Sequence, residues 1–509
     1  MYSPRLMLYA LRSSCVLDIR LLPSQLLCEF PAEISKEITR RLGSAFEAIY
    51  RVTYNLLWLI ALRPLNQKHT KSHFGQIFRA AITARIEGWG DLVGLLETIA
   101  VTLHSSSLRD YDTLRGFLQD EWASKETHFF TEVWPELVRL ALEMPQLFPE
   151  SSLLCLSEEH RELELSRRQV GCLVIHQFLC SLPKQPWATD SSQDFRIWYS
   201  SGSRHLLATR AYLSSLFTYF QRLSGVGDET QRVLSPLMNE WRIIFTLRIL
   251  QENQVVQLDP SLLKYPLCRL TVVHLPTAST EPSLLGLPDG ACVISANKNV
   301  GFGQTGTQEE TQVGSSPESC PVVLLTPTLQ NNQVLIVQGA EAMVTIKGYG
   351  REARLDSVLT ADYGFSAGDS QWSKWRRRTM LFMDALQLDQ FIVDKRKIAD
   401  HLPGHVDREL LKAYNAFSSS PGKGECKSNY TEIVTGLWGC GAFGGNPQTK
   451  TLIQWCAASM AQTNLRLVLS GEDHFALASE LNEIVKMTRE GLWTVKNVLD
   501  TIGALKPYD

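Results

Sequence analysis

Two adjacent carboxylates follow a glycine-rich stretch near the middle of the 509-residue chain. In VGFGQTGTQEE, residues 300–310, Gly301 and Gly303 precede Glu309 and Glu310 by a few positions. Adjacent carboxylates repel each other, so one of a close pair is expected to hold its proton more tightly than usual. Such a carboxyl can protonate a leaving oxygen in glycosidic cleavage, while its neighbour binds sugar hydroxyls. The common alternative, a solvated Glu-Glu pair, is disfavoured because a predicted strand and a glycine loop come directly before it.

Residues 301–306 also match the G-x-G-x-x-G fingerprint of dinucleotide-binding dehydrogenases, and residues 439–444 match it again. That fingerprint requires a preceding strand, a helix that opens at the last glycine, and an acid about 20 residues further on. The first match is followed by QEETQVGSSPES, which we interpret as a loop. After the second match, Glu472 and Asp473 come too late. A dinucleotide-dependent oxidoreductase is therefore a weak alternative.

The second glycine stretch has the features of a diphosphate cradle. Residues 436–445 contain five glycines together with Trp438 and Phe443. Glycines permit left-handed backbone and close approach, and free N–H groups beside a helix N-terminus bind phosphate groups. Asn446 is expected to cap the following helix, with Pro447 in its first turn. The alternative is a tight turn packed on a sheet, for which fewer glycines would suffice.

Two kinds of pattern divide the chain near residue 255. Apolar spacing of three and four residues predicts helices in the first half, at residues 127–148, 157–182, 205–224 and 230–252. Short β-rich runs follow at residues 268–275, 291–297, 321–327, 332–339 and 465–471, with helices at 448–462 and 474–489. Residues 307–320 and 417–428 have loop-like composition. Strands interleaved with helices predict an α/β or α+β fold with a mixed sheet.

Composition restricts the partners. The apolar fraction is 44% and the formal net charge is −3, so a polyanionic ligand must be bound by local donors. The run at residues 374–378 could attract a polyanion, serve in nuclear import or form a solvated helix face. No apolar run reaches the roughly 18 residues of a membrane span. The longest, residues 54–62, is interpreted as a buried helix turn.

Cysteine and histidine spacing does not predict a metal site. The eleven cysteines form no C-x-x-C pair and suggest reduced thiols in a cytosolic or nuclear protein. His401 and His405 are interrupted by Pro403, and we interpret them as surface loop histidines. We expect neither a metal nor a cofactor. The first 20 residues faintly resemble a mitochondrial presequence, although an ordinary amphipathic helix is the favoured interpretation.

The glycine loop followed by Gln-Glu-Glu resembles the signature of the poly(ADP-ribose) glycohydrolases, in which a glycine triplet precedes these residues in a macrodomain. VISANKNVG, TIKGYGREARL, TGLWGCGAFGGNPQTKTLIQW and the helical FFTEVWPELVRLALEMPQLFP are also similar to that family. The resemblance covers about residues 127–505. It implies a macrodomain-like mixed sheet flanked by helices at residues 256–509, preceded by an all-helical accessory domain at 127–255. Residues 1–126 are expected to be a helical extension of unknown role.

The resemblance also implies a reaction and its residues. Glu310 would protonate the leaving ribose oxygen, after which water would attack the anomeric carbon and release ADP-ribose from poly(ADP-ribose) on modified proteins. Glu309 would bind ribose hydroxyls. The remaining substrate contacts would come from Asn297, Gly301, Gly303 and Gln308 at the ribose, Tyr349 at the adenine, Leu437, Trp438, Gly439, Cys440, Gly441 and Ala442 at the diphosphate, and Phe443 at the pocket wall. We expect a monomer that binds no nucleic acid sequence-specifically and no membrane, in the nucleus, the cytoplasm or, less favoured, mitochondria.

Four positions depart from the family pattern. Phe302 replaces a glycine of the triplet and must turn its ring away from the ligand, and the loop at 303–308 is shorter. Ile294 stands where the family has an aspartate, and Ser470 lies where aromatics usually precede a glycine. A module that binds ADP-ribose without hydrolysing the polymer is therefore the alternative. Two mutually repelling acids argue against it, because a binding module has no use for them.

Overall fold

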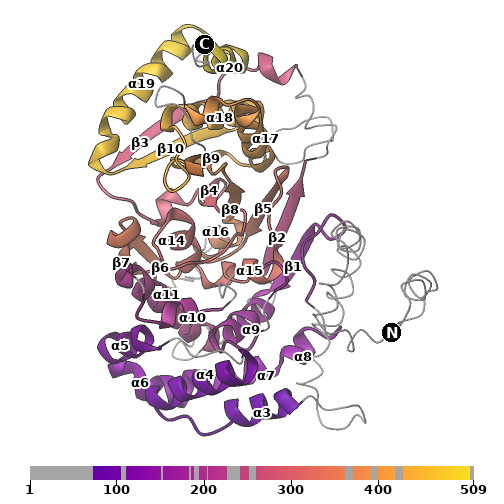
Figure 1. Cartoon of the computed structure of the whole chain (residues 1–509), viewed down its shortest axis with the longest axis vertical. Helices are drawn as coiled ribbons and strands as arrows, with labels where there is room; N and C mark the ends of the chain where they lie inside the picture. The colour runs from indigo at the N-terminus through magenta and orange to yellow at the C-terminus, as the bar shows by residue number, and fades with distance from the viewer. Residues whose placement is uncertain are drawn as a thin grey trace, which may run out of the picture. The chain divides into compact units, whose positions relative to one another are not determined.

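The computed structural model describes residues 73–104, 110–150, 153–182, 185–188, 194–202, 204–225, 241–250, 260–360, 371–390, 398–418 and 428–504. The predictions for residues 1–20, 54–62 and most of 417–428 lie outside these ranges. The described residues belong to one compact unit. Figure 1 shows three layers within it: helices from the first part of the chain, a sheet, and helices from the last part.

The middle layer is a mixed sheet of eight strands in the described residues. Its order is β1-β2-β5-β8-β4-β9-β10-β3. Five neighbouring strands run parallel: β8, β4, β9, β10 and β3. The other three, β1, β2 and β5, pair antiparallel with their neighbours. The strands are β1 Glu162–Ser166, β2 Arg242–Ile249, β3 Leu270–Leu275, β4 Ala291–Ala296, β5 Gln333–Gln338, β8 Thr379–Asp384, β9 Glu432–Thr435 and β10 Asn464–Ser470. A separate hairpin pairs β6 Val344–Lys347 with β7 Arg354–Val358.

Strand β4 shows how the sheet separates two cores. Its residues alternate between the faces, since successive side chains of a strand point to opposite sides. Cys292, Ile294 and Ala296 pack into the core shared with the first helices. Ala291 and Val293 pack into the core shared with the last helices. Both faces of this strand are therefore covered, which explains its continuous apolar run.

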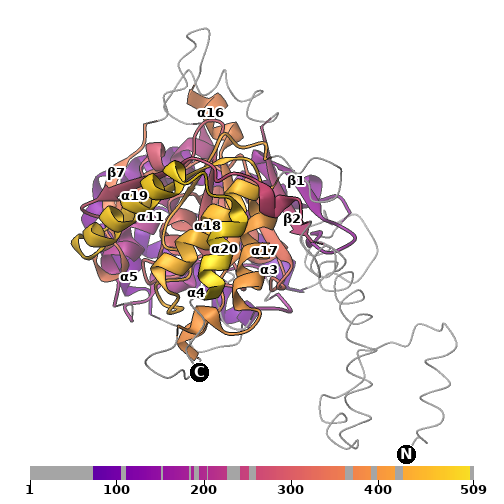
Figure 2. The same cartoon turned by 90° about the horizontal axis from the view of Figure 1, so that it is seen from above.

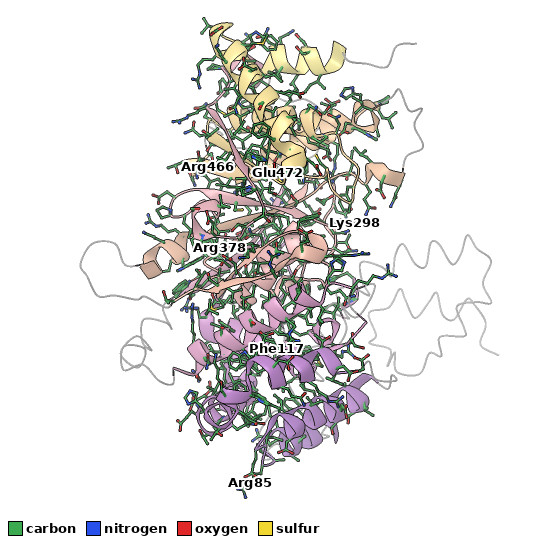
Figure 3. The ribbon with its side chains drawn as sticks, turned by 90° about the vertical axis from the view of Figure 1, so that its left-hand side faces the viewer. Arg85, Phe117, Lys298, Arg378, Arg466 and Glu472 are labelled. Atoms are coloured by element: carbon green, nitrogen blue, oxygen red, sulfur yellow. The ribbon has the colours of Figure 1, made fainter. Side chains whose placement is uncertain are left out.

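The helices of the first layer pack around a cluster of phenylalanines that includes Phe117, Phe178 and Phe217. Figure 3 shows Phe117 in this layer and Arg378 at the level of the sheet. The helices are α3 His73–Ile82, α4 Trp89–His104, α5 Asp112–Glu121, α6 Glu126–His128, α7 Trp134–Leu142, α8 Met144–Leu147, α9 Arg167–Phe178, α10 Arg196–Tyr199 and α11 Leu206–Ser224, with a π-helical turn at Phe129–Val133.

The second helical layer covers the opposite face. It contains α17 His405–Phe417, α18 Pro447–Met460, α19 Phe475–Glu490 and α20 Val495–Ala504. Figure 2 shows α17, α18 and α20 together on this face, in agreement with the contacts of α18 with both neighbours. Three shorter helices lie in connections: α14 Gln308–Gly314, α15 Val322–Leu325 and α16 Gln371–Arg377.

Several predicted elements are confirmed. Helices occupy the predicted ranges 127–148, 205–224, 448–462 and 474–489, and strands occupy 268–275, 291–297, 332–339 and 465–471. Strands β6 to β9 were not predicted. They are four to six residues long. Strand β7 contains Asp356, β6 and β8 end on a charged residue, and β9 begins on one, so none is a purely apolar run.

Three predicted helices or strands are wrong in whole or in part. The range 157–182 begins as a strand, because ELELS alternates apolar and charged residues, and the helix starts only after Ser166, whose side chain caps it. In the described part of the range 230–252, residues 241–250, the chain forms β2 and not the predicted helix, because RIIFTLRI alternates likewise and buries Ile243, Phe245 and Leu247 on one face. The predicted strand at 321–327 contains the helical turn α15, since a short apolar run does not by itself distinguish the two structures.

Candidate active site

Both glutamates lie in the first turn of helix α14. Thr307 is the N-cap: its hydroxyl accepts a hydrogen bond from the Glu310 N–H, and the Glu310 carboxylate accepts one from the Thr307 N–H. This reciprocal pair is a capping box. Acidic side chains in a first turn are also stabilised by the helix dipole. The prediction that residues 307–320 form a loop is therefore wrong, because Thr-x-x-Glu initiates a helix here.

Glu309 is buried and holds the preceding loop through its carboxylate. Oε2 accepts a hydrogen bond from the Asn297 N–H, and Oε1 accepts one from the Gly301 N–H, both at 2.9 Å. Only 8% of the residue is exposed. Desolvation raises the pKa of Glu309 to about 8, against the two backbone hydrogen bonds, and the neighbouring charges of Glu310 and Asp384 raise it further. The predicted tighter hold on a proton thus falls on Glu309.

Glu310 is partly exposed and is the more accessible of the two acids. Its Oε2 accepts hydrogen bonds from the N–H groups of Thr305 at 2.9 Å and Thr307 at 3.0 Å, and from the Thr305 hydroxyl. The carboxyl rests against Gly303, where an added Cβ would lie 2.6 Å from the Glu310 Cδ. Only glycine leaves room for this approach.

Gln308 and Asn297 use polar atoms to organise the backbone. The Gln308 side chain accepts from the Ser295 N–H at 2.7 Å and donates to the Val293 carbonyl at 2.9 Å, which fixes α14 to strand β4. Asn297 Oδ1 accepts from the Asn299 N–H. The contacts of Gln308 and Asn297 with a ribose stay predictions. The amide of Gln308 already hydrogen-bonds to the backbone of β4.

The second glycine loop connects β9 with α18. As predicted, Asn446 caps the helix by accepting from the Thr449 N–H at 2.9 Å, and Pro447 lies in its first turn. The backbone N–H groups of Gly441, Ala442 and Phe443 have no hydrogen-bond partner among the described residues, and Gly441 and Ala442 are exposed. Consecutive unpaired N–H groups next to a helix N-terminus form an anion cradle.

The side chains beneath this loop point into the core. The Trp438 indole is fully buried and donates to the Met383 carbonyl at 2.9 Å, so only its backbone can face a ligand. Burial raises the pKa of the Cys440 thiol to about 12, which keeps it neutral. Leu437 and Phe443 are partly buried and pack against the adjoining core. Gly439 has φ of +74°, a conformation that favours glycine.

A buried ionic network supports the loop from below. Lys450, which is 0% exposed, pairs with Glu409 and lies 3.6 Å from Asp400. Its Nζ also lies 5.0 Å from the centre of the Trp438 ring. Asp400 accepts a hydrogen bond from the Asn446 N–H at 2.8 Å. Because buried charges require paired partners, this network gives the loop one arrangement.

Tyr349 connects the two loops. It follows β6, is 53% exposed, and its hydroxyl lies 3.0 Å from the position that a Cβ on Gly441 would occupy. Burial and the nearby Glu310 carboxylate raise the pKa of Tyr349. The Gly350 N–H donates to the Gly306 carbonyl at 2.8 Å, which attaches this segment to the first loop. The glutamates and the N–H cradle therefore border the same site.

Two departures from the family pattern have structural explanations. Phe302 is 4% exposed and packs against Phe195 and Trp198, so its ring is directed into the helical layer, as expected. Ile294 is fully buried in the sheet core and contributes no polar group. Asp384, paired in register with Ala296 at the end of β8, provides a negative charge near Glu309.

Sequence reasoning missed several residues of this site. Thr305 and Thr307 hold Glu310, and the T-x-x-E spacing was the signal that could have identified Thr307. Asp384 ends an apolar run, MLFMD, that was not recognised as a strand. Trp198 donates from its indole to the Gly303 carbonyl at 2.7 Å, and no local pattern in the sequence indicates that contact.

The histidines and the basic run differ in part from expectation. His405 is the first residue of α17, and His401 is partly buried with Nε2 3.1 Å from the Thr449 hydroxyl, so they are not exposed loop residues. Arg376 and Arg377 are exposed, but Arg378 is buried and donates to Gln312. The described residues contain no group of three or more His, Cys, Asp or Glu side chains placed to hold a metal. No helix in the described ranges has the length and apolar character needed to cross a bilayer.

The arrangement defines a class of protein. One loop with a carboxylate pair follows strand β4, and one loop with an N–H cradle follows the parallel strand β9. Both strands belong to a mixed sheet that has helices on both faces. The chain also matches two family models. One describes the macrodomain fold of poly(ADP-ribose) glycohydrolase, at residues 278–476, and the other its helical domain, at residues 122–236. Together the matches span more than half of the chain. The chain belongs to the poly(ADP-ribose) glycohydrolase family.

Individual relatives are distant. The chain is 22% identical over 414 residues to the probable poly(ADP-ribose) glycohydrolase 2 of Arabidopsis thaliana, covering 71% of this chain and 76% of the relative. It is also 22% identical to poly(ADP-ribose) glycohydrolase 1 of that plant, covering 77% and 81%. A crystal structure of the Deinococcus radiodurans poly(ADP-ribose) glycohydrolase with ADP-ribose is similar at 14% identity and a TM-score of 0.27, covering 48% of this chain and 95% of that one.

Proposed function

We propose that this protein hydrolyses the ribose–ribose O-glycosidic bonds of poly(ADP-ribose) and releases ADP-ribose. Family membership and the relatives named as glycohydrolases support the activity. The observation that carries the proposal is the shared site: Tyr349 lies against Gly441 of the N–H cradle and close to Glu310, so a bound diphosphate places its ribose near an accessible carboxyl.

We propose the following roles for this chain's own groups. The N–H groups of residues 441–443 bind the diphosphate, and Glu309 holds the ribose-facing loop while accepting from sugar hydroxyls. The Glu310 carboxyl donates its proton to the leaving ribose oxygen as the C–O bond breaks. Water then bonds to the anomeric carbon and returns a proton to the Glu310 carboxylate, so the enzyme ends in its initial state.

Replacing Glu310 with Gln tests this assignment. Gln keeps the size of the side chain, but its amide is too weak an acid to protonate the leaving oxygen, so release of ADP-ribose from purified polymer should fall by about 10²–10⁴-fold. Affinity for ADP-ribose, measured by calorimetry, should change little. Glu472→Gln, at an exposed position at the end of β10, is the control and should keep the wild-type rate. A wild type that binds polymer but releases nothing would identify a binding module instead.

The remaining expectations form part of the proposal. We propose residues 127–255 as an accessory domain and 256–509 as the catalytic domain, with polymer on modified proteins as the partner. The protein would act as a monomer in the nucleus or cytoplasm, without sequence-specific binding to nucleic acid.

A further inference from the structure

A group of buried aromatic side chains from the first helical layer packs against the loop that precedes Glu310. Phe195, Trp198 and Tyr212 come from this layer, and Phe302 comes from the loop; all are at most 4% exposed. The Phe195 and Trp198 rings stack at 4.5 Å with an interplanar angle of 7°. Phe302 lies 5.0 Å and 5.2 Å from these two rings. The residue that interrupts the glycine triplet thus anchors the loop to the helical layer.

Trp198 also holds the loop by a hydrogen bond. Its Nε1–H donates to the Gly303 carbonyl at 2.7 Å. Gly303 is the residue whose Cα lies against the Glu310 carboxyl. The other hydrogen bonds to that carboxyl come from Thr305 and Thr307 in the same short loop. A shift of Gly303 would therefore change the whole environment of Glu310.

Tyr212, on α11, approaches helix α14 directly. Its ring fills the space beside Gly314, where an added Cβ would lie 2.8 Å from the Tyr212 Cγ. The ring also lies 5.4 Å from that of Trp198. The Tyr212 hydroxyl is buried and lies against the backbone of Gly306, between the two threonines that donate to the Glu310 carboxyl.

Tyr212 thus meets both segments that place the Glu310 carboxyl: its ring packs beside Gly314 of α14, and its hydroxyl lies against the loop at Gly306. A carboxyl that must give its proton to one particular oxygen depends on its placement, so the loss of such a contact should lower the rate more than the affinity.

We propose that Trp198 and Tyr212 are positioning residues for the hydrolytic step: Trp198 fixes the loop that presents the Glu310 carboxyl, and Tyr212 packs against helix α14, which carries Glu310. The inference rests on the proposed function and gives the helical layer a part in it. Both side chains are at most 1% exposed, so neither can touch a ligand. Their replacement should consequently lower the rate and leave affinity unchanged.

Two conservative variants test this inference. Trp198→Phe and Tyr212→Phe each remove one donor and keep an aromatic ring. Trp241→Phe is the control for the first, because Trp241 is equally buried and donates to the Gly339 carbonyl at 2.9 Å. Tyr111→Phe is the control for the second, since the Tyr111 hydroxyl is likewise buried. The measurements are kcat and KM for ADP-ribose release from polymer, ADP-ribose affinity by calorimetry, and melting temperature.

We expect kcat to fall about tenfold or more in Trp198→Phe and Tyr212→Phe, with KM and affinity within about twofold of wild type. The two control variants should keep the wild-type kcat, KM and affinity. If the wild type is active and both variants match their controls, the inference is overturned and the proposed function stands. An equal loss of affinity and rate in the variants has the same meaning. A wild type that releases no ADP-ribose overturns the proposed function as well. If Trp198→Phe melts well below its control, Tyr212→Phe, which preserves shape, decides the outcome.

Discussion

At the scale of single residues, the two neighbouring glutamates have different environments. Glu309 is enclosed and accepts two backbone hydrogen bonds, whereas Glu310 is partly exposed and held by the threonines of the loop. The sequence indicates that one of the pair should hold its proton more tightly, but burial decides which one. Burial depends on the approach of β4, β8 and the loop, none of which is encoded in the dipeptide itself.

The raised pKa of Glu309 predicts a pH dependence of stability. Its pKa is about 8 in the folded protein and near 4.5 when the group is unperturbed. Between these values the folded state holds a proton that the unfolded state has lost. The contribution of Glu309 to the free energy of unfolding is therefore fully present at low pH and is lost as pH rises towards 8, with a slope of at most about 1.4 kcal/mol per pH unit.

Glu309→Gln removes this titration. Denaturant unfolding at several pH values between 5 and 9 should show wild type losing stability relative to the variant as pH rises. Parallel curves for the two proteins would contradict the prediction, because they would show that Glu309 titrates alike in the folded and unfolded states.

At the scale of elements, local pattern explains some outcomes and tertiary contact the others. The second glycine loop and its helix were predictable, because Asn446, Pro447 and the glycines each act locally. Helix α14 was predictable in principle from Thr307-x-x-Glu310. Strands β8 and β9 were not, because both pair with β4, which is distant in the sequence. The position of Tyr349 depends likewise on a distant segment, since its hydroxyl lies against Gly441.

The second glycine loop allows a matched pair of substitutions. Gly439 has φ of +74°, and a Cβ there would lie 2.5 Å from the Ala385 Cβ. Gly439→Ala should cost about 1–3 kcal/mol of stability and displace the N–H cradle, weakening ADP-ribose binding about tenfold. Gly436→Ala meets only the Val468 carbonyl at 3.5 Å and should be nearly neutral. Calorimetry and thermal unfolding measure both effects. Equal behaviour of the two variants would show that the loop's backbone geometry does not determine binding.

At the scale of the whole molecule, the first helices and the sheet share buried structure. Strands β1 and β2 come from the first part of the chain yet extend the same sheet as β4 and β8. A buried ionic network also joins the layers: Arg167 of α9 and Arg222 of α11 pair with Glu341, and Arg167 also pairs with Glu318. All four side chains are less than 9% exposed. The helical layer and the macrodomain should therefore unfold together.

Glu341→Gln tests this coupling. Glu341 is 2% exposed and accepts from Arg167 and Arg222, each at 2.8 Å. The substitution removes the buried negative charge that Arg167 and Arg222 share, while Glu318 still pairs with Arg167. The free energy of unfolding should therefore fall by about 3–5 kcal/mol in a single transition. Glu136→Gln, which breaks a half-exposed pair with Arg139, should change it by less than about 1 kcal/mol. Calorimetry and circular dichroism measure both variants. Two separate transitions, with only one of them shifted in Glu341→Gln, would show that the layers fold independently. In that case the helical layer could position Glu310 only after it docks onto a preformed sheet.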